Sequence, residues 1–258
     1  MIASLKLQNN SNIMNSFWKQ PIPLLLCFVA AGLTGCVDLS RAKLSPEKKA
    51  ASYSAHYSTH AVKAHSVKNK TKARVAKSQG EVHTLLGGLG VFSMGMSDIR
   101  NEVAKQYSKV SASSNMWYNG GDVAYSIKHY YYTHKKHRPI ILVGHSLGAN
   151  EQIKIARNLN AAGIPVDLLV TVDAVSQTIV PPNVKHALNI YKTGYVPMFS
   201  GLKLRAVDPS ATKIENINVD DLKGVHVNHF TIEKNQMVQA MILDEVKKVL
   251  VDGNKKAA

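Results

Sequence analysis

The chain has 258 residues, of which 45% are hydrophobic and 19% charged, so its composition is that of a globular protein with room for one medium α/β domain and additional segments. Its net charge of +15 would suit a nucleic-acid-binding protein, but residues 41–78 alone hold ten basic side chains and one acidic one. Because most of the excess charge lies in that segment, the sequence does not predict a nucleic-acid partner.

Residues 1–35 have the features of an export signal. The apolar run PIPLLLCFVAAGL at residues 21–33 follows Lys19 and is shorter than the roughly 20 residues that a membrane-spanning helix needs. It leads into Leu-Thr-Gly-Cys, which resembles the lipobox of bacterial lipoproteins. The resemblance implies cleavage before Cys36 and acylation of that cysteine, which would anchor the protein stably in a membrane. The alternative is an ordinary signal peptide followed by a chance cysteine.

Neighbouring residues bear on processing and location. A start at Met14 would leave a compact signal, so we expect Met14 to be the true first residue. Val37 stands where an aspartate would retain a lipoprotein at the inner membrane, which favours a lipid-anchored protein of the outer membrane that faces the periplasm. Both cysteines, Cys27 and Cys36, precede the predicted folded region, so neither a disulfide framework nor a cysteine-ligated metal site is predicted.

Residues 36–78 have the composition of a flexible tether, because they are rich in alanine, serine, lysine and histidine and show little apolar periodicity. Their positive charge either rests on anionic envelope material or belongs to a solvated spacer. The histidines are spaced too irregularly to predict a metal site, and no cofactor is predicted for the chain.

Residues 79–258 alternate strand and helix patterns and form the predicted folded domain. The expected elements, in chain order, are a strand at 81–90, a helix at 96–108, strand 109–117, helix 122–136, strand 139–144, helix 150–163, strands 166–173 and 186–193, and a closing helix at 231–250. Apolar strands that alternate with helices predict an α/β fold, with a mostly parallel central sheet and helices on both faces. Residues 194–228 are expected to be a long loop region, which either covers the site as a lid or packs on the surface.

The sequence Gly-His-Ser-Leu-Gly at residues 144–148 is a GxSxG motif between a buried strand and a helix. This is the context of the nucleophile elbow of α/β-hydrolases, in which a tight turn exposes the serine hydroxyl and small neighbours let the helix pass close to the strand. Ser146 is therefore the predicted nucleophile, and the Leu147 amide at the helix N-terminus is the predicted first oxyanion donor. The alternative is a turn serine in an inactive hydrolase fold. His145 is expected to point away from the reacting face and to support packing.

A catalytic serine needs a base and an acid that orients the base, and in this fold both follow the serine in the chain. Of the three histidines after Ser146, His186 opens a strand at the wrong end of the sheet, so His226 and His229 remain, in the loop before the last helix. His229 is the predicted base because it is nearer the helix, and His226 is the alternative. Asp173 is the predicted acid, because it ends a buried strand at the site edge of the sheet.

The glycine-rich stretch LLGGLGVFSMGM at residues 85–96 follows the first strand and lets the backbone approach a substrate closely. The amide of Leu89 or of Gly90 is the predicted second oxyanion donor. The alternative is a glycine-rich turn without a catalytic part.

The stretches GGLGVFSMGM, ILVGHSLGAN, DLLVTVDAV, VPPNV and NHFTI, in that order, resemble a group of small, often exported bacterial α/β-hydrolases related to lipases and thioesterases. The resemblance covers roughly residues 80–250. It implies a reduced α/β-hydrolase fold and a hydrolase that cleaves an acyl ester through Ser146, His229 and Asp173. It supplies neither the substrate and its acyl chain length nor the oligomeric state. The competing hypothesis is a catalytically inactive hydrolase-fold lipoprotein that binds envelope components.

Overall fold

The computed structural model of the chain describes residues 79–194 and 201–252. The predicted export signal, the acylation site at Cys36 and the basic tether lie outside the described residues. So do residues 195–200 of the predicted loop region. The structure therefore bears on the predicted folded domain.

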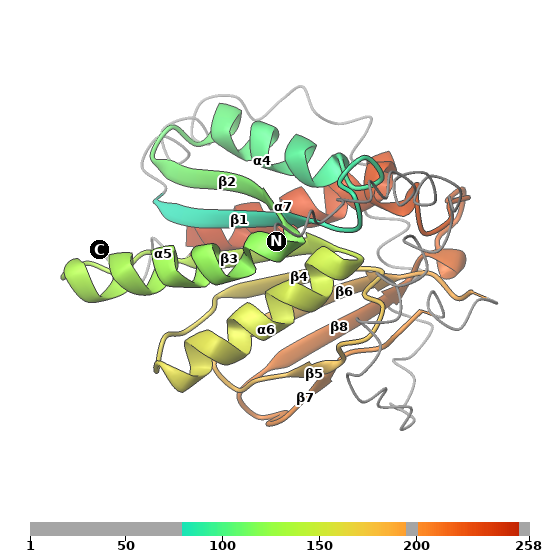
Figure 1. Cartoon of the computed structure of the whole chain (residues 1–258). Helices are drawn as coiled ribbons and strands as arrows, with labels where there is room; N and C mark the ends of the chain where they lie inside the picture. Colours follow the sequence, from blue (N-terminus) through green and yellow to red (C-terminus); the bar gives the residue numbers. More distant parts are fainter. Residues whose placement is uncertain (1–78, 195–200, 253–258) are drawn as a thin grey trace, which may run out of the picture. The chain divides into compact units, whose positions relative to one another are not determined.

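Six parallel strands form the central sheet in the order β2-β1-β3-β4-β6-β8 (Figure 1). They are β1 (Gly80–Leu86), β2 (Val110–Met116), β3 (Ile140–His145), β4 (Leu168–Val172), β6 (His186–Tyr191) and β8 (Lys213–Asn218). The two-residue strands β5 (Ile179–Val180) and β7 (Arg205–Ala206) form a separate parallel pair. Strands β3 and β4 are buried along their whole length, as their apolar sequences predict for a sheet covered on both faces.

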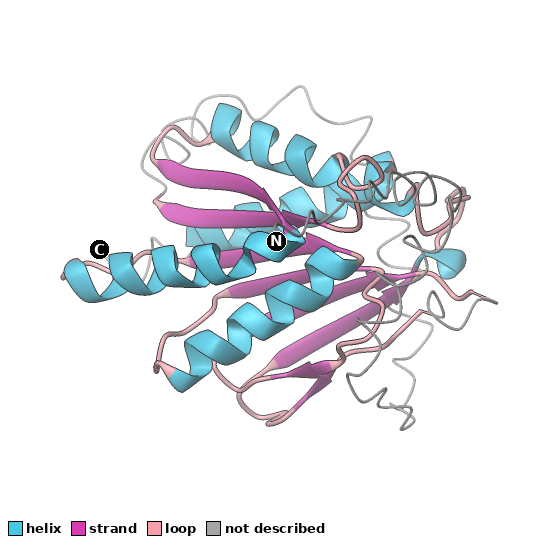
Figure 2. Ribbon diagram, viewed as in Figure 1, coloured by secondary structure: helices cyan, strands magenta, loops and turns pink. Residues whose placement is uncertain are grey.

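Helices cover both faces of this sheet (Figure 2). The helices are α4 (Gly95–Gln106), α5 (Gly120–Thr133), α6 (Leu147–Ala161) and α7 (Gln236–Asp252), with short 3-10 helices η1 (Trp117–Asn119), η3 (Val219–Asp221) and η4 (Ile232–Lys234). Ile99 of α4 and Met241 of α7 belong to the core on one face, and Ile127 of α5 and Ile153 of α6 to the core on the other. The predicted α/β fold with helices on both faces is therefore confirmed. Within the described ranges, no helix has the length and apolar character needed to cross a membrane.

The prediction of a long loop region at residues 194–228 is wrong, because this segment supplies β7, β8 and η3. β8 is the edge strand of the sheet, and its sequence KIENIN holds only two apolar side chains. Ile217 belongs to the core on one face, whereas Ile214 packs against the core on the other. A strand that places one isoleucine on each face carries too weak an apolar pattern to be recognised from the sequence. The lid proposed for this region falls partly on residues 195–200, outside the described residues.

The closing helix predicted at residues 231–250 is interrupted. After η4, Asn235 has an extended backbone, and its side-chain oxygen accepts the amides of Met237 at 3.0 Å and Val238 at 3.3 Å. Asn235 therefore caps α7, which starts one residue later. Residues 222–231, between η3 and η4 and including His229, run as an irregular segment along the edge of the sheet where β1, β3 and β4 end.

Candidate active site

Ser146 lies in a sharp turn between β3 and α6. Its backbone has φ 57° and ψ −121°, a conformation that L-residues rarely adopt and that costs about 1–3 kcal/mol. The turn is held by the Ser146 amide, which donates to the Val172 carbonyl at 2.9 Å. A Cβ atom on Gly144 would lie 2.5 Å from the carbonyl of Gly148, so the strand and the helix pass too close for any larger residue. The predicted tight turn with small flanking residues is thus the geometry observed.

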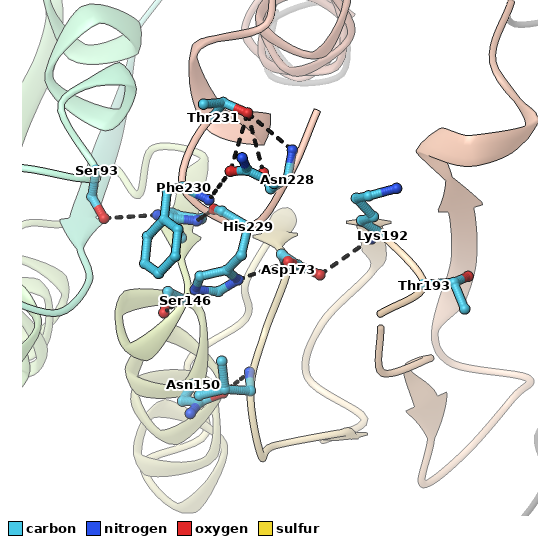
Figure 3. Close-up of polar contacts among 12 residues, drawn as sticks. Ser93, Ser146, Asn150, Asp173, Lys192, Thr193, Asn228, His229, Phe230 and Thr231 are labelled. Atoms are coloured by element: carbon cyan, nitrogen blue, oxygen red, sulfur yellow. Dashed lines mark hydrogen bonds and ion pairs between the residues drawn. The ribbon is translucent and has the colours of Figure 1, made fainter. Parts of the chain in front are cut away.

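The structure brings Ser146, His229 and Asp173 together, although they lie on three separate segments (Figure 3). The Ser146 hydroxyl lies 2.9 Å from Nε2 of His229, and Nδ1 of His229 lies 2.7 Å from Oδ2 of Asp173. Because the carboxylate only accepts, Nδ1 carries the proton, and the neutral imidazole accepts the serine hydroxyl at Nε2. All three side chains are buried. This arrangement can draw a proton from a serine hydroxyl as that oxygen attacks an electrophile.

Asp173 is fixed by its own backbone and by the chain that follows it. It has φ 48° and, with Ser146, is one of two residues other than glycine with positive φ among the described residues. Its amide donates to the Ile190 carbonyl at 2.8 Å, and its Oδ1 accepts the Lys192 amide at 3.1 Å. With one carboxylate oxygen held by the backbone, the other is aimed at His229.

Other histidine and aspartate side chains that follow Ser146 in the chain lie elsewhere in the structure, as His226, His186 and Asp167 show. His226 is exposed, and no contact joins it to Ser146 within the described part of the chain. His186 opens β6 at the opposite end of the sheet and pairs with Glu215 and Glu245. Asp167 accepts the amide of residue 140 at the amino end of β3. Among the histidines that the structure describes, only His229 has the position that a base for Ser146 requires.

The turn after β1 packs directly on the elbow. A Cβ on Gly87 would lie 2.8 Å from the Cβ of Ser146 and 3.1 Å from the Leu147 amide nitrogen, so only glycine fits there. The amide of Gly90, one of the two predicted second donors, donates to the Gly87 carbonyl at 2.9 Å and closes the turn, which favours the other candidate, Leu89. The amides of Gly88 and Leu89 make no hydrogen bond within the described ranges, so they remain candidates for the second donor.

Three buried polar residues support the site, and the sequence pattern assigned a supporting role only to one of them. His145 contacts Ser93 and the His229 backbone and makes no hydrogen bond to the Ser146 hydroxyl, as expected of a supporting residue. Ser93 was one of several small residues in a glycine-rich stretch. Asn150 accepts the amides of three successive residues, 175–177, through its Oδ1. The sequence signal for that contact is a polar asparagine in the first turn of the helix, two residues after the motif.

Large apolar side chains are exposed around the site. Leu89 and Phe92, from the segment after β1, are 80% and 54% exposed, and Phe230, next to His229, is 47% exposed. The rings of Phe92 and Phe230 lie 5.2 Å apart, so the two segments meet beside the histidine. Exposed apolar groups gathered in this way are typical of surfaces that receive an apolar ligand.

Within the described residues, no group of three or more histidine, cysteine, aspartate or glutamate side chains is arranged to hold a metal ion.

Comparison with known proteins identifies no family. No family model matches the chain, and no curated protein matches it in sequence. Among solved structures, the chain is similar to a type II thioesterase, BorB, from the borrelidin biosynthetic cluster, with 10% sequence identity and a TM-score of 0.36 over 66% of this chain and 94% of the thioesterase. A similarity this distant assigns neither substrate nor activity, so the geometry around Ser146 alone bears on function.

Proposed function

We propose that this protein is a serine hydrolase that cleaves an acyl ester or thioester through an acyl-enzyme. The observation that carries the proposal is the chain of two hydrogen bonds from Ser146 through His229 to Asp173, with the serine on a strained turn. In the first step the Ser146 oxygen attacks the acyl carbonyl carbon, and His229 Nε2 takes the hydroxyl proton. His229 then gives that proton to the leaving alcohol or thiol. Water, deprotonated by His229, attacks the acyl-enzyme, releases the acid and restores the serine.

Backbone amides at the elbow supply the charge stabilisation that this chemistry needs. The Leu147 amide stands at the N-terminus of α6, where amides have no helical partner and the helix dipole favours negative charge. The Gly87 backbone lies against that amide, so the following amides, of Gly88 and Leu89, are the nearest source of a second donor. Two preorganised donors would stabilise the tetrahedral intermediate, and removing one such donor costs about 100- to 1,000-fold in rate.

The acyl group is proposed to be apolar. Exposed Phe92 and Phe230 lie beside His229, and exposed Leu89 belongs to the same turn as Gly87, so these side chains can receive a hydrocarbon chain. The export signal and anchor predicted from the sequence favour esters such as envelope lipids or acylated glycans over thioesters of intracellular carriers.

The nucleophile assignment is tested by replacing the serine. Ser146→Ala should lose nearly all turnover of a short p-nitrophenyl ester and all labelling by a fluorophosphonate probe, a loss of several orders of magnitude. Ser126→Ala, an exposed serine on α5, is the matched control and should behave as wild type. Equal turnover by wild type and Ser146→Ala would eliminate the hydrolase proposal and favour a non-catalytic binding lipoprotein.

We also propose that the chain is anchored in the outer membrane of a bacterial envelope through acylated Cys36. The support is the short apolar run and lipobox-like sequence that end at this cysteine. Cys36→Ser should abolish incorporation of labelled palmitate and release the protein from the membrane fraction, whereas Cys27→Ser should retain the label. Palmitate incorporation that survives Cys36→Ser would show that the acylated residue is not Cys36.

A further inference from the structure

Ser93 and His145 are two fully buried polar residues that take no part in the proposed reaction. Each is 1% exposed, and they come from the segment after β1 and from the end of β3. The Ser93 hydroxyl lies 2.7 Å from Nδ1 of His145, and Nε2 of His145 lies 2.9 Å from the backbone carbonyl of His229. On the other side, the amide of Gly87 donates to the Ser93 hydroxyl oxygen at 3.0 Å. Figure 3 shows Ser93 and His229 on separate segments that converge on the site.

The direction of each of these hydrogen bonds follows from the groups involved. A carbonyl oxygen only accepts, so Nε2 of His145 carries the proton and donates to His229. Burial and, to a smaller extent, neighbouring His229 together lower the pKa of His145 to about 3, so the ring is neutral and Nδ1 has a free lone pair. The Ser93 hydroxyl must then donate to Nδ1, while its oxygen accepts the Gly87 amide. The donors and acceptors agree along the whole chain of bonds, from Gly87 to His229.

This chain of bonds joins the two segments whose spacing matters most for the reaction. One end is Gly87, whose backbone packs on Ser146 and Leu147 and precedes the proposed second oxyanion donor. The other end is the backbone of His229, in the segment between η3 and η4 that belongs to no strand or helix. We propose, on the basis of the hydrolase function above, that Ser93 and His145 are positioning residues. They fix the turn at residues 87–90, the oxyanion turn, and the general base His229 at a constant distance from each other on either side of Ser146.

The neutral state of His145 matters for the same reason. Its ring centroid lies 5.0 Å from that of His229, which becomes an imidazolium when it takes the serine proton. A second cation at that distance in a buried site would oppose that step, whereas a neutral ring does not. His145 can therefore hold the His229 backbone without working against the charge that the reaction places on the His229 ring.

The test separates positioning from simple structural support by measuring kcat, KM and thermal unfolding on the full chain with a p-nitrophenyl ester. Ser93→Ala removes the hydroxyl between Gly87 and His145, whereas Ser93→Thr keeps it. His145→Gln places an amide nitrogen near the position of Nε2, so it retains the donor to His229 and loses the Ser93 contact. Ser97→Ala, on α4 four residues after Ser93, removes a half-buried hydroxyl that pairs with Ser114 of β2 at 3.1 Å, and it is the matched control.

Ser93→Ala and His145→Gln should each lower kcat by about 10- to 100-fold, because small displacements of reacting groups cost that much, while KM stays within about twofold. Ser93→Thr should recover most of the loss, and Ser97→Ala should turn over as wild type. The double variant Ser93→Ala/His145→Gln should lose no more than either single variant, because both break the same link.

Several results would overturn the positioning role. A kcat of wild-type size in both Ser93→Ala and His145→Gln, even with a lowered unfolding temperature, would make these residues structural support only. Losses that multiply in the double variant would show that the two side chains act independently. If Ser93→Ala does not fold, kcat is compared between Ser93→Thr and His145→Gln. A lower kcat in His145→Gln alone supports the positioning role, and an unchanged kcat in both overturns it. Wild-type protein without turnover that depends on Ser146 would instead refute the hydrolase function itself.

Discussion

His229 meets Ser146 through one ring nitrogen and Asp173 through the other, whereas His226, three residues earlier, is exposed. Only one imidazole can satisfy both contacts, so His229→Ala should fall to about the residual activity of Ser146→Ala, since members of a triad act as a unit. His226→Ala, the matched control from the same segment, should keep most of its activity. Steady-state kinetics on a p-nitrophenyl ester would measure both. An inactive His226→Ala beside an active His229→Ala would reverse the assignment of the base.

At this scale, the sequence predicted residues that a motif or a strand end marks, and missed those that depend on hydrogen bonding within a turn. Ser146 stands in a recognisable motif, and Asp173 ends a strand of unmistakable apolar character. The flexible backbone of Gly90 favours it as a second oxyanion donor, yet its amide donates a hydrogen bond to the Gly87 carbonyl. Which amide in a glycine-rich turn faces a substrate is decided by the φ and ψ values of the turn, and composition does not fix them.

The segment that follows β4 owes its shape to one side chain of α6. Asn150 is buried, and its Oδ1 accepts the amides of residues 175, 176 and 177 at 3.1, 3.2 and 3.3 Å, while its Nδ2 donates to the Ser176 hydroxyl at 2.9 Å. These amides begin two residues after Asp173, so Asn150 ties the acid's segment to the helix that starts at the nucleophile.

Asn150→Ala should therefore lower both stability and turnover. Leaving buried or half-buried donors without a partner costs about 1–3 kcal/mol each, and water reaching the loop would recover part of that cost. Asp173 would also lose part of the support behind it, so kcat should fall. Denaturant unfolding and ester kinetics are the measurements, with Asn158→Ala, an exposed asparagine on the same helix, as control. Wild-type stability in Asn150→Ala would show that the segment after β4 holds its shape without this contact.

Elements with strong apolar patterns were predicted from the sequence, and elements defined by one or two contacts were not. The strands β3 and β4 and the helix α6 fall within a few residues of their expected ranges. β8 was missed because an edge strand buries less apolar surface, and the break before α7 was missed because it depends on Asn235 capping the helix. The break shortens the predicted helix at its start and leaves His229 outside it, as expected for a loop residue.

Across the whole molecule, the parallel sheet is what assembles the site. Ser146 and His229 lie 83 positions apart in the chain, and His229 and Asp173 lie 56 apart. Because all six strands run in one direction, the segments after β1, β3 and β4 emerge at one edge, where the final irregular segment reaches them. The order of elements predicts this shared edge and the GxSxG motif marks the nucleophile, and together they are why three distant residues could be predicted to meet.

One buried carboxyl group makes the stability of the whole domain depend on pH. Glu233, four residues after His229, is fully buried beside Gly95 at the start of α4. Burial raises the pKa of Glu233 to about 7, and the Gly95 amide and Lys234 only partly offset this effect. The Glu233 side chain packs η4, which follows the segment with His229, against the start of α4. Its ionisation therefore changes the stability of the contact between these two elements.

The sign of the effect follows from proton binding. Glu233 has a pKa near 4.5 when unfolded and about 7 when folded, so between these values the folded state binds more protons and the free energy of unfolding falls as pH rises. Glu233→Gln keeps the shape and removes the titration. Its unfolding temperature, relative to wild type, should therefore be higher at pH 8 than at pH 5 in thermal scans. Glu102→Gln, a half-buried glutamate on α4, is the control and should show no such dependence. A difference between Glu233→Gln and wild type that is the same at both pH values would mean that Glu233 is ionised throughout, with the positive end of α4 compensating for its burial.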